Sequence, residues 1–121
     1  MARIRTVKPA LFRSRKVTRW PVGVRWTFAG LFTYCDDYGF GVDEAALVKS
    51  DVYPLDKRMT DAKVEEHLAQ IAADGPLCRY DVDGEAYLHI PSWQEHQRVN
   101  RPTDSQFPPC PKHPDQPRSR Q

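Results

Sequence analysis

The sequence predicts a small, mainly α-helical domain that ends in a β-hairpin, with a basic arm before it and a proline-rich tail after it. Three observations predict this fold class: apolar residues recur at helical spacing, a two-residue turn signal separates two short strands, and prolines concentrate after residue 101. With 121 residues and 14.0 kDa, the chain has room for one domain. We expect an arm over 1–23, the domain over 24–95 and a flexible tail over 96–121.

The arm is expected to form one short turn that packs on the domain through Leu11, Phe12 and Trp20. The first helix follows over 24–37. It is apolar around most of its circumference, so it should be the central and most buried helix. Gly39 lies where a C-terminal cap would end it.

Two shorter helical patterns follow the first helix. The second helix is predicted to begin after an N-cap at Asp43 and to end before Pro54. The third begins at an N-cap, Thr60, and runs to about Asp74. Its buried stripe at helical spacing consists of Val64, Leu68 and Ile71.

A β-hairpin is predicted over 77–82 and 85–90. Asp83-Gly84 lies between these segments and is the strongest short signal for a type I′ turn. A two-residue turn sets the register of the strands, so side chains that face each other can be named. The expected pairs are Tyr80 with Tyr87 and Cys78 with His89, while Leu77, Leu88 and Ile90 close the core from the other face.

Three helices followed by a two-stranded hairpin is the element order of a winged helix-turn-helix, three helices plus a wing. Four segments also resemble a known family: 1–9 (MARIRTVKP), 30–37 (GLFTYCDD), 79–85 (RYDVDGE) and 93–102 (WQEHQRVNRP). They are similar to small winged-helix DNA-binding proteins of actinobacterial phages and prophages. These proteins are in turn similar to the N-terminal domain of phage replisome organisers and DnaD-like initiation proteins. The resemblance extends from residue 1 to about residue 111 and implies a fold and a DNA-binding role rather than a chemistry.

Charge is distributed unevenly along the chain. No acidic residue precedes Asp36, acids dominate 36–95, and the tail is basic again, so the net charge of +2 hides two basic ends. This separation is typical of ends that contact a polyanion. We therefore expect double-stranded DNA to be the partner.

The candidate DNA-binding residues fall into three groups. In the arm, Arg3 and Arg5 suit a narrow minor groove, and the other basic residues suit phosphates. These others are Lys8, Arg13, Arg15, Lys16 and Arg19. Around the third helix, which enters the major groove in a winged helix, the candidates are Lys49, Lys57, Arg58 and Lys63. After the wing they are Gln97, Arg98, Asn100 and Arg101.

Each group has an alternative interpretation. The arm can pack on the acidic middle of its own domain or of a second copy instead of contacting DNA. The third helix, which also carries Glu65 and Glu66, can present an ordinary solvated face. The residues after the wing can belong to an ordinary polar tail.

Cys35, Cys78 and Cys110 are odd in number and widely spaced, which argues against a disulfide framework. Cys110 and His113 form a C-x-x-H pair, and a zinc site built on it would need to recruit a histidine such as His89 or His96. Because a second tight pair is missing, we expect no metal and no cofactor. The expectation is a free thiol in a disordered tail; a small zinc protein is the alternative.

Enzymatic activity is not expected. Adjacent acids such as Asp36-Asp37 point apart, and the chain has neither a glycine-rich phosphate loop nor a nucleophile motif. No small-molecule substrate is expected. No apolar run approaches the roughly 18 residues of a membrane span, and no apolar segment typical of a signal peptide follows the basic N-terminus, so a cytoplasmic location is expected.

Together these observations predict a DNA-binding winged-helix protein of phage type that acts in replication initiation or transcription regulation. Its partners would be DNA, possible further copies of itself and replication proteins. The alternative is a protein–protein adaptor or oligomerisation module of a replication complex that does not bind DNA directly. In that case the acidic third helix would bind a basic surface, such as the arm of another copy.

Overall fold

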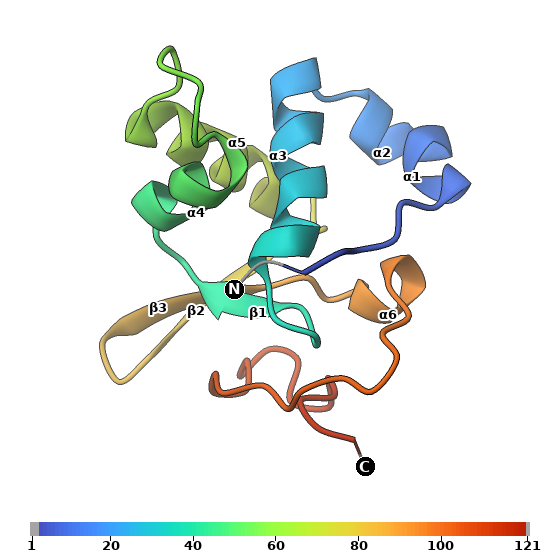
Figure 1. Ribbon diagram of the computed structural model, residues 1–121. Helices are drawn as coiled ribbons and strands as arrows, with labels where there is room; N and C mark the ends of the chain where they lie inside the picture. Colours follow the sequence, from blue (N-terminus) through green and yellow to red (C-terminus); the bar gives the residue numbers. More distant parts are fainter. Residues whose placement is uncertain (1–2, 121) are drawn as a thin grey trace.

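The computed structural model describes residues 3–120 and shows a mixed helical chain with a small three-stranded antiparallel sheet (Figure 1). The helices α3, α4 and α5 lie on one side of this sheet, and the coil that follows α6 runs along the other side (Figure 1). Residues 1 and 2, at the start of the predicted arm and of the segment 1–9, lie outside the described residues. Residue 121, at the end of the predicted tail, also lies outside them. Within residues 3–120, no helix is long and apolar enough to cross a membrane.

The predicted central helix is α3, Val22–Tyr34, and its buried side chains include Phe28 and Leu31. It ends before Asp36, because the Oδ1 atom of that residue accepts hydrogen bonds from the backbone N–H groups of Tyr38 and Phe40 and closes a turn. Gly39, with φ of +92°, lies in this turn and does not cap the helix as predicted. A Cβ atom there would come within 2.8 Å of the Trp93 ring.

The two shorter helices are α4, Ala45–Val52, and α5, Asp61–Ala73. The cap of α5 is confirmed, since the Thr60 hydroxyl accepts a hydrogen bond from the Lys63 N–H at 3.1 Å. The predicted cap of α4 is wrong. Glu44 occupies the N-cap position, and the carboxylate of Asp43 instead accepts hydrogen bonds from the Arg79 guanidinium at 2.7 and 2.9 Å.

The hairpin consists of β2, Cys78–Val82, and β3, Glu85–His89. Both turn residues, Asp83 and Gly84, have positive φ, as a type I′ turn requires. The register confirms both expected pairs, Tyr80 with Tyr87 and Cys78 with His89. Leu77, Leu88 and Ile90 are buried in the main core, as predicted.

A third strand, β1, was not predicted. It spans only Phe40–Val42, includes a glycine and shows no clear alternation, so the sequence carries little signal for it. It pairs with β3 and gives the strand order β1-β3-β2, with Phe40 opposite His89.

The arm forms two short helices, α1 (Pro9–Arg13) and α2 (Arg15–Thr18), where one turn was expected. Leu11 and Trp20 are buried as predicted, and the Trp20 indole N–H donates to Asp74 at 2.6 Å. Phe12 is different, since it remains 69% exposed. The arm is therefore part of the folded domain.

The tail packs on the sheet, in contrast to the flexible extension that was expected. After the short helix α6, Trp93–His96, the chain has no regular secondary structure up to residue 120, yet it makes specific contacts. The Tyr80 hydroxyl donates to the Pro108 carbonyl at 2.7 Å, and the Gln116 amide donates to the Ile90 carbonyl at 3.0 Å. Cys110 is fully buried.

Candidate functional site

The first two arginines of the arm, Arg3 and Arg5, contact Asp37 of their own domain. The Arg5 side chain is only 4% exposed and donates to Asp37 Oδ1 at 2.9 Å and to two backbone carbonyls, those of Phe32 and Cys35. Its guanidinium also lies 5.2 Å from the centroid of the Trp93 ring. Arg5 therefore cannot reach a minor groove in this structure, and the alternative of an arm that packs on its own domain applies to it.

Asp37 holds three parts of the chain together. Its carboxylate pairs with Arg3 and Arg5 of the arm and accepts a hydrogen bond from the Thr103 N–H of the tail at 2.9 Å. Burial alone would raise the pKa of Asp37, but the hydrogen bonds from Thr103 and Arg5 and the two positive charges outweigh it, so this pKa is lowered. The carboxylate is thus ionised, and it fixes both ends of the chain to the turn after α3.

Two further candidates also have structural contacts. Gln97 is buried and exchanges two hydrogen bonds with the backbone of Thr6, at 2.8 and 2.7 Å. The Lys8 ammonium donates to the Glu95 carbonyl at 2.9 Å. These contacts tie the arm to α6, so Gln97 and Lys8, like Arg5, are engaged within the protein in this structure.

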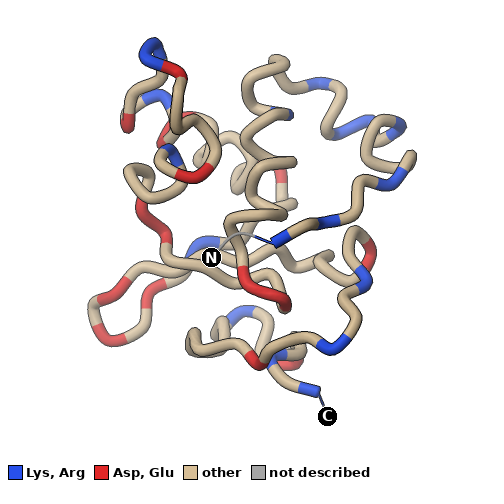
Figure 2. Tube along the Cα trace, in the orientation of Figure 1, with Lys and Arg blue, Asp and Glu red and all other residues tan. Residues whose placement is uncertain are grey.

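Exposed cations remain on one edge of the molecule, which we call the basic edge. Figure 2 shows Lys and Arg along α1, α2 and the segment after α6. In Figure 1, α1, α2 and α6 lie on the same side of the molecule. In the part of the chain that the structure describes, none of these side chains forms an ion pair with an acidic group. The basic edge comprises Arg13, Arg15, Lys16, Arg19, Arg98 and Arg101, with Asn100 between the last two.

The surface around α5 carries charges of both signs. Lys49 pairs with Asp61 at 3.8 Å, and Lys63 donates to the Arg58 carbonyl at 3.1 Å. Glu65 pairs with Arg79 at 2.6 Å, and the hydrogen bonds of this pair lower the pKa of Glu65. The cations predicted around the third helix are therefore partly neutralised by neighbouring acids.

The hairpin tip is acidic. Asp81, Asp83 and Glu85 are all exposed there, and Figure 2 shows acidic residues along this loop. Phosphates would be repelled at this end of the molecule. The β2–β3 hairpin therefore does not extend the basic edge.

His67 behaves as an ordinary core histidine. Its Nδ1 atom lies 2.7 Å from the Thr27 hydroxyl, which also contacts the Tyr53 hydroxyl at 2.7 Å. Burial lowers the pKa of His67. The side chain is partly buried and hydrogen-bonded, which leaves it no free role at the surface.

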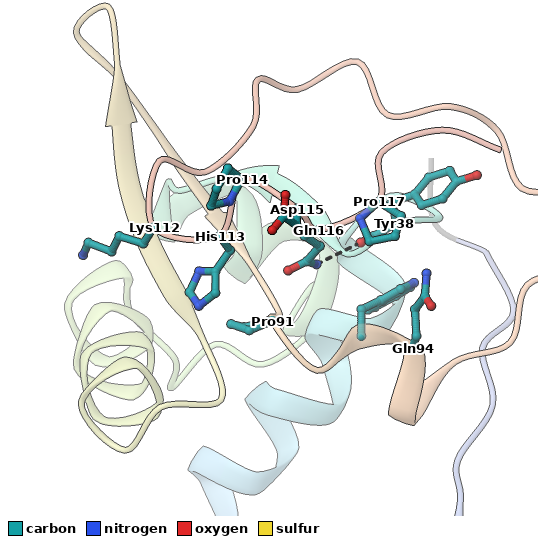
Figure 3. Close-up of a pocket in the computed structure, with 10 residues that line it drawn as sticks. Tyr38, Pro91, Gln94, Lys112, His113, Pro114, Asp115, Gln116 and Pro117 are labelled. Carbon is teal, nitrogen blue, oxygen red and sulfur yellow. Dashed lines mark hydrogen bonds between the residues drawn. The ribbon is translucent and has the colours of Figure 1, made fainter. Parts of the chain in front are cut away.

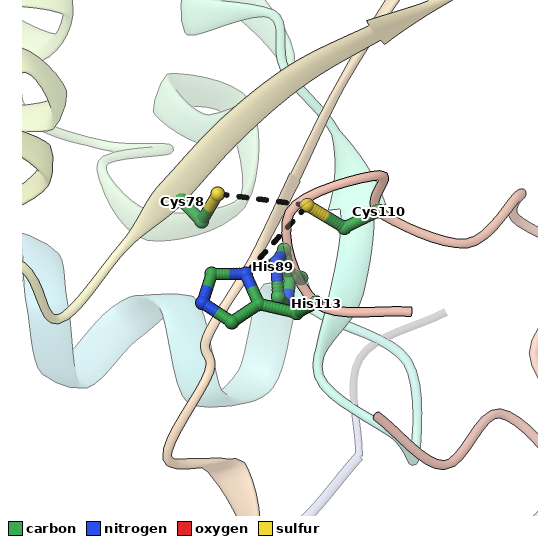
Figure 4. A group of neighbouring side chains, drawn as sticks. All are labelled: Cys78, His89, Cys110 and His113. Carbon is green, nitrogen blue, oxygen red and sulfur yellow. Dashed lines mark hydrogen bonds between the residues drawn. The ribbon is translucent and has the colours of Figure 1, made fainter. Parts of the chain in front are cut away.

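Four potential metal ligands converge where the tail meets the hairpin (Figure 4). Cys78 comes from β2, His89 from β3, and Cys110 and His113 from the tail, and their ligand atoms all lie within 4.8 Å of one another. The two sulfur atoms are 3.6 Å apart, and Cys110 Sγ lies 3.7 Å from His113 Nδ1. We call these four residues the Cys/His cluster.

His89 is the most constrained member of the Cys/His cluster. It is fully buried, its ring stacks on Phe40 at a centroid distance of 5.1 Å, and the Tyr80 ring meets it in a T-shaped arrangement at a centroid distance of 5.6 Å. Neither of its ring nitrogens has a hydrogen-bond partner among the described residues. Burial and the nearby His113 lower the pKa of His89 to about 4 against the opposing effect of the Gln116 side chain, which lies near the ring without forming a hydrogen bond of good geometry. The ring is therefore neutral and keeps a lone pair.

The sequence contained both halves of this cluster separately. The hairpin register placed Cys78 opposite His89, and Cys110 and His113 formed a C-x-x-H pair. What could not be read from the sequence was that a proline-rich tail returns to this point of the sheet. Cys110 is a free thiol, as expected, but it lies in a buried cluster and not in a disordered tail.

A hollow of about 430 Å³ lies beside the Cys/His cluster (Figure 3). Tail residues 112–117 form one wall, and Pro91 and Gln94 line the opposite side. Gln116 closes its inner end, where its amide donates to the carbonyls of Ile90 and Tyr38 at 3.0 and 3.5 Å. The hollow therefore exists only while the tail is in place.

No protein-family model, curated protein or solved structure matches this chain. The geometry of the basic edge and of the Cys/His cluster therefore carries the functional argument.

Proposed function

We propose that this protein is a winged-helix DNA-binding protein that binds duplex DNA mainly through its basic edge. The element order α3-β1-α4-α5-β2-β3 and the strand order β1-β3-β2 support the winged-helix assignment. In such a fold α4 and α5 form the helix-turn-helix and β2 and β3 form the wing. Replication initiation and transcription regulation are the settings that the phage resemblance implies.

The observation that carries the proposal is the segregation of unpaired cations. Arg13, Arg15, Lys16 and Arg19 are exposed on α1 and α2, and no acidic residue occurs in the chain before Asp36. Each cation that reaches a phosphate releases a counterion, which supplies most of the affinity of sequence-independent binding. Arg98 and Arg101 extend this surface after α6.

The usual reading surface of a winged helix is less suited to DNA in this chain. Asp61, Glu65 and Glu66 lie on the exposed side of α5. Asp61 pairs with Lys49 and Glu65 with Arg79, so these acids already occupy nearby cations. The acidic tip of the β2–β3 hairpin, which is the wing of this fold, carries three more negative charges. We therefore expect backbone contacts from the basic edge to dominate over base contacts from α5.

The test is binding of a labelled random duplex across a salt series. Replacing Arg13, Arg15, Lys16 and Arg19 by Gln should weaken binding and reduce the slope of log K against log salt by about 3 to 4, because about 0.9 is lost for each phosphate contact. The matched control replaces four cations at the other end, Lys49, Lys57, Arg58 and Lys63, by Gln. It removes the same charge and should change the slope much less.

The outcomes separate the possible binding modes. If the slope of log K against log salt falls in the control variant and stays unchanged in the basic-edge variant, DNA binds through the surface around α5 and the proposed surface is wrong. If the unchanged protein does not bind DNA at low salt, the DNA-binding proposal is wrong.

A second candidate function is the protein–protein adaptor, and an exposed apolar groove favours it. Val22, Trp26 and Leu55 are 72, 62 and 91% exposed and line a groove of about 880 Å³ between the start of α3 and the α4–α5 loop. Such exposed apolar area commonly marks a protein interface. Under this candidate, Trp26→Ser should abolish self-association measured by sedimentation equilibrium, and the unchanged protein should not bind DNA.

A further inference from the structure

The Cys/His cluster offers two sulfur and two imidazole ligands from three separate parts of the chain. Two thiolates and two imidazoles are a common ligand set of structural zinc, which prefers four such ligands and a tetrahedral geometry. Four protein ligands would fill the tetrahedral coordination of the ion, so no position would remain open for water or substrate. The chemistry of the donors therefore suits Zn²⁺ rather than a hard cation such as Mg²⁺ or Ca²⁺.

The distances fit a tetrahedral ion. With Zn–S bonds of about 2.3 Å and Zn–N bonds of about 2.0–2.1 Å, a tetrahedron separates two sulfurs by about 3.8 Å and a sulfur from a nitrogen by about 3.5 Å. The corresponding separations are 3.6 Å between Cys78 Sγ and Cys110 Sγ and 3.7 Å between Cys110 Sγ and His113 Nδ1. These two separations match a tetrahedral ion, and all four ligand atoms lie within 4.8 Å of one another.

The unpartnered ring of His89 is an independent observation that points to a ligand. The structure has only three buried side-chain nitrogen or oxygen atoms without a hydrogen-bond partner among residues 3–120, and two of them are Nδ1 and Nε2 of His89. Leaving a buried polar atom without a partner costs about 1–3 kcal/mol. A metal ion bound to one ring nitrogen would remove this cost at that atom.

A disulfide between Cys78 and Cys110 explains the cluster less well. The sulfurs lie 3.6 Å apart, whereas a disulfide requires about 2.05 Å. It would also leave His89 and His113 without a role, although their ring centroids are 4.9 Å apart at the same point. The histidines therefore distinguish a metal site from a redox pair.

The position of the cluster indicates what a metal would do. The tail between residues 97 and 120 contains no helix or strand and has only a small apolar cluster beneath it, in which Cys110 is the tail's one fully buried side chain. A segment of this kind buries too little apolar surface to order itself. A metal bound by two tail residues and two hairpin residues would supply the missing free energy, as in other small metal-stabilised folds.

We propose that Cys78, His89, Cys110 and His113 form a structural Zn²⁺ site that fastens the C-terminal tail to the β2–β3 hairpin. The site would be tetrahedral, with each of the four side chains supplying one ligand atom. It would also hold tail residues 112–117 in place as one wall of the hollow beside Gln116. This inference does not depend on DNA binding, since none of the four residues belongs to the basic edge.

The first experiment measures metal content and coordination in the full-length protein. Protein purified under reducing conditions without added chelator is expected to contain one zinc per chain. After the zinc is replaced by Co²⁺, the absorption spectrum should show intense tetrahedral d–d bands and a thiolate-to-cobalt charge-transfer band. Cys110→Ser and His113→Asn should each lose stoichiometric zinc.

Matched controls come from the same chain. Cys35→Ser changes a buried cysteine outside the Cys/His cluster, and His96→Asn changes a partly buried histidine outside it. Both variants should retain one zinc per chain. Because a cluster variant can fail to fold, the unchanged protein is also tested by limited proteolysis with and without a strong chelator, and chelation should open cleavage sites in 98–120 alone.

The result that overturns the proposal is equally specific. Reduced full-length protein that binds neither Zn²⁺ nor Co²⁺, gives no thiolate charge-transfer band and keeps its tail protected from protease would exclude a metal site. Cobalt binding that persists unchanged in both Cys110→Ser and His113→Asn would place the metal elsewhere and would also overturn it.

Discussion

The two faces of the sheet are covered by different means. On the helical face, α3, α4 and α5 close a main core of sixteen buried residues. On the tail face, the second cluster has only four buried residues, and the contacts that accompany it are hydrogen bonds, the Asp37 carboxylate and the Cys/His cluster. The comparison teaches that apolar burial holds the helical face, whereas a few specific polar contacts hold the tail face.

The largest expected effect is a cavity in the main core. Leu68 is fully buried on α5, so Leu68→Ala should lower the free energy of unfolding by about 4 kcal/mol. Phe107→Ala is the matched change on the tail face, where Phe107 is only partly buried, and it should cost about 1 kcal/mol. Urea denaturation of both variants measures the difference, and equal losses would mean that the two faces depend on burial alike.

The next effect concerns the polar contacts of Asp37. Asp37→Asn keeps the shape of the side chain but leaves the buried Arg5 guanidinium without its charged partner, which should cost about 3 kcal/mol. The arm and the tail should also become protease-sensitive before the helical core does. Glu66→Gln, which removes an exposed and unpaired charge from α5, should change stability by less than about 0.5 kcal/mol.

The same carboxylate predicts a dependence on pH. Because the pKa of Asp37 is lower in the folded chain than in the unfolded one, its contribution to stability is complete above its ordinary pKa of about 4. This contribution is lost as the pH falls through the lowered value. Thermal unfolding between pH 7 and pH 2 should therefore show an acid loss that is smaller in Asp37→Asn, and parallel curves would assign the loss to other groups.

The smallest effect lies in the hairpin turn, which belongs to the sheet that both faces share. Gly84 has φ of +83°, and a Cβ atom there would meet nothing within 4 Å. Gly84→Ala should therefore cost only the backbone strain of about 1–2 kcal/mol. Gly84→Asn is the control, since Asn tolerates this conformation, and it should cost less in the same denaturation assay. Similar losses would show that the turn is not left-handed in solution.

Much of the helical layer and of the hairpin could be predicted from the sequence. The Thr60 cap, the buried stripe of α5 and the register from Cys78 with His89 to Tyr80 with Tyr87 all follow from residues close in the chain. Local rules suffice there, because spacing and turn type determine which side chains share a face.

The sequence by itself determined the central helix, the third helix, the hairpin with its turn and the separation of basic ends from an acidic middle. Only the tertiary structure decided that Asp43 binds Arg79 instead of capping a helix, and that Asp37 holds Arg5. It also decided that Cys110 and His113 meet Cys78 and His89. The physical reason is that these contacts join segments far apart in the chain, and loop closure is decided by the free energy of the whole fold rather than by any local pattern.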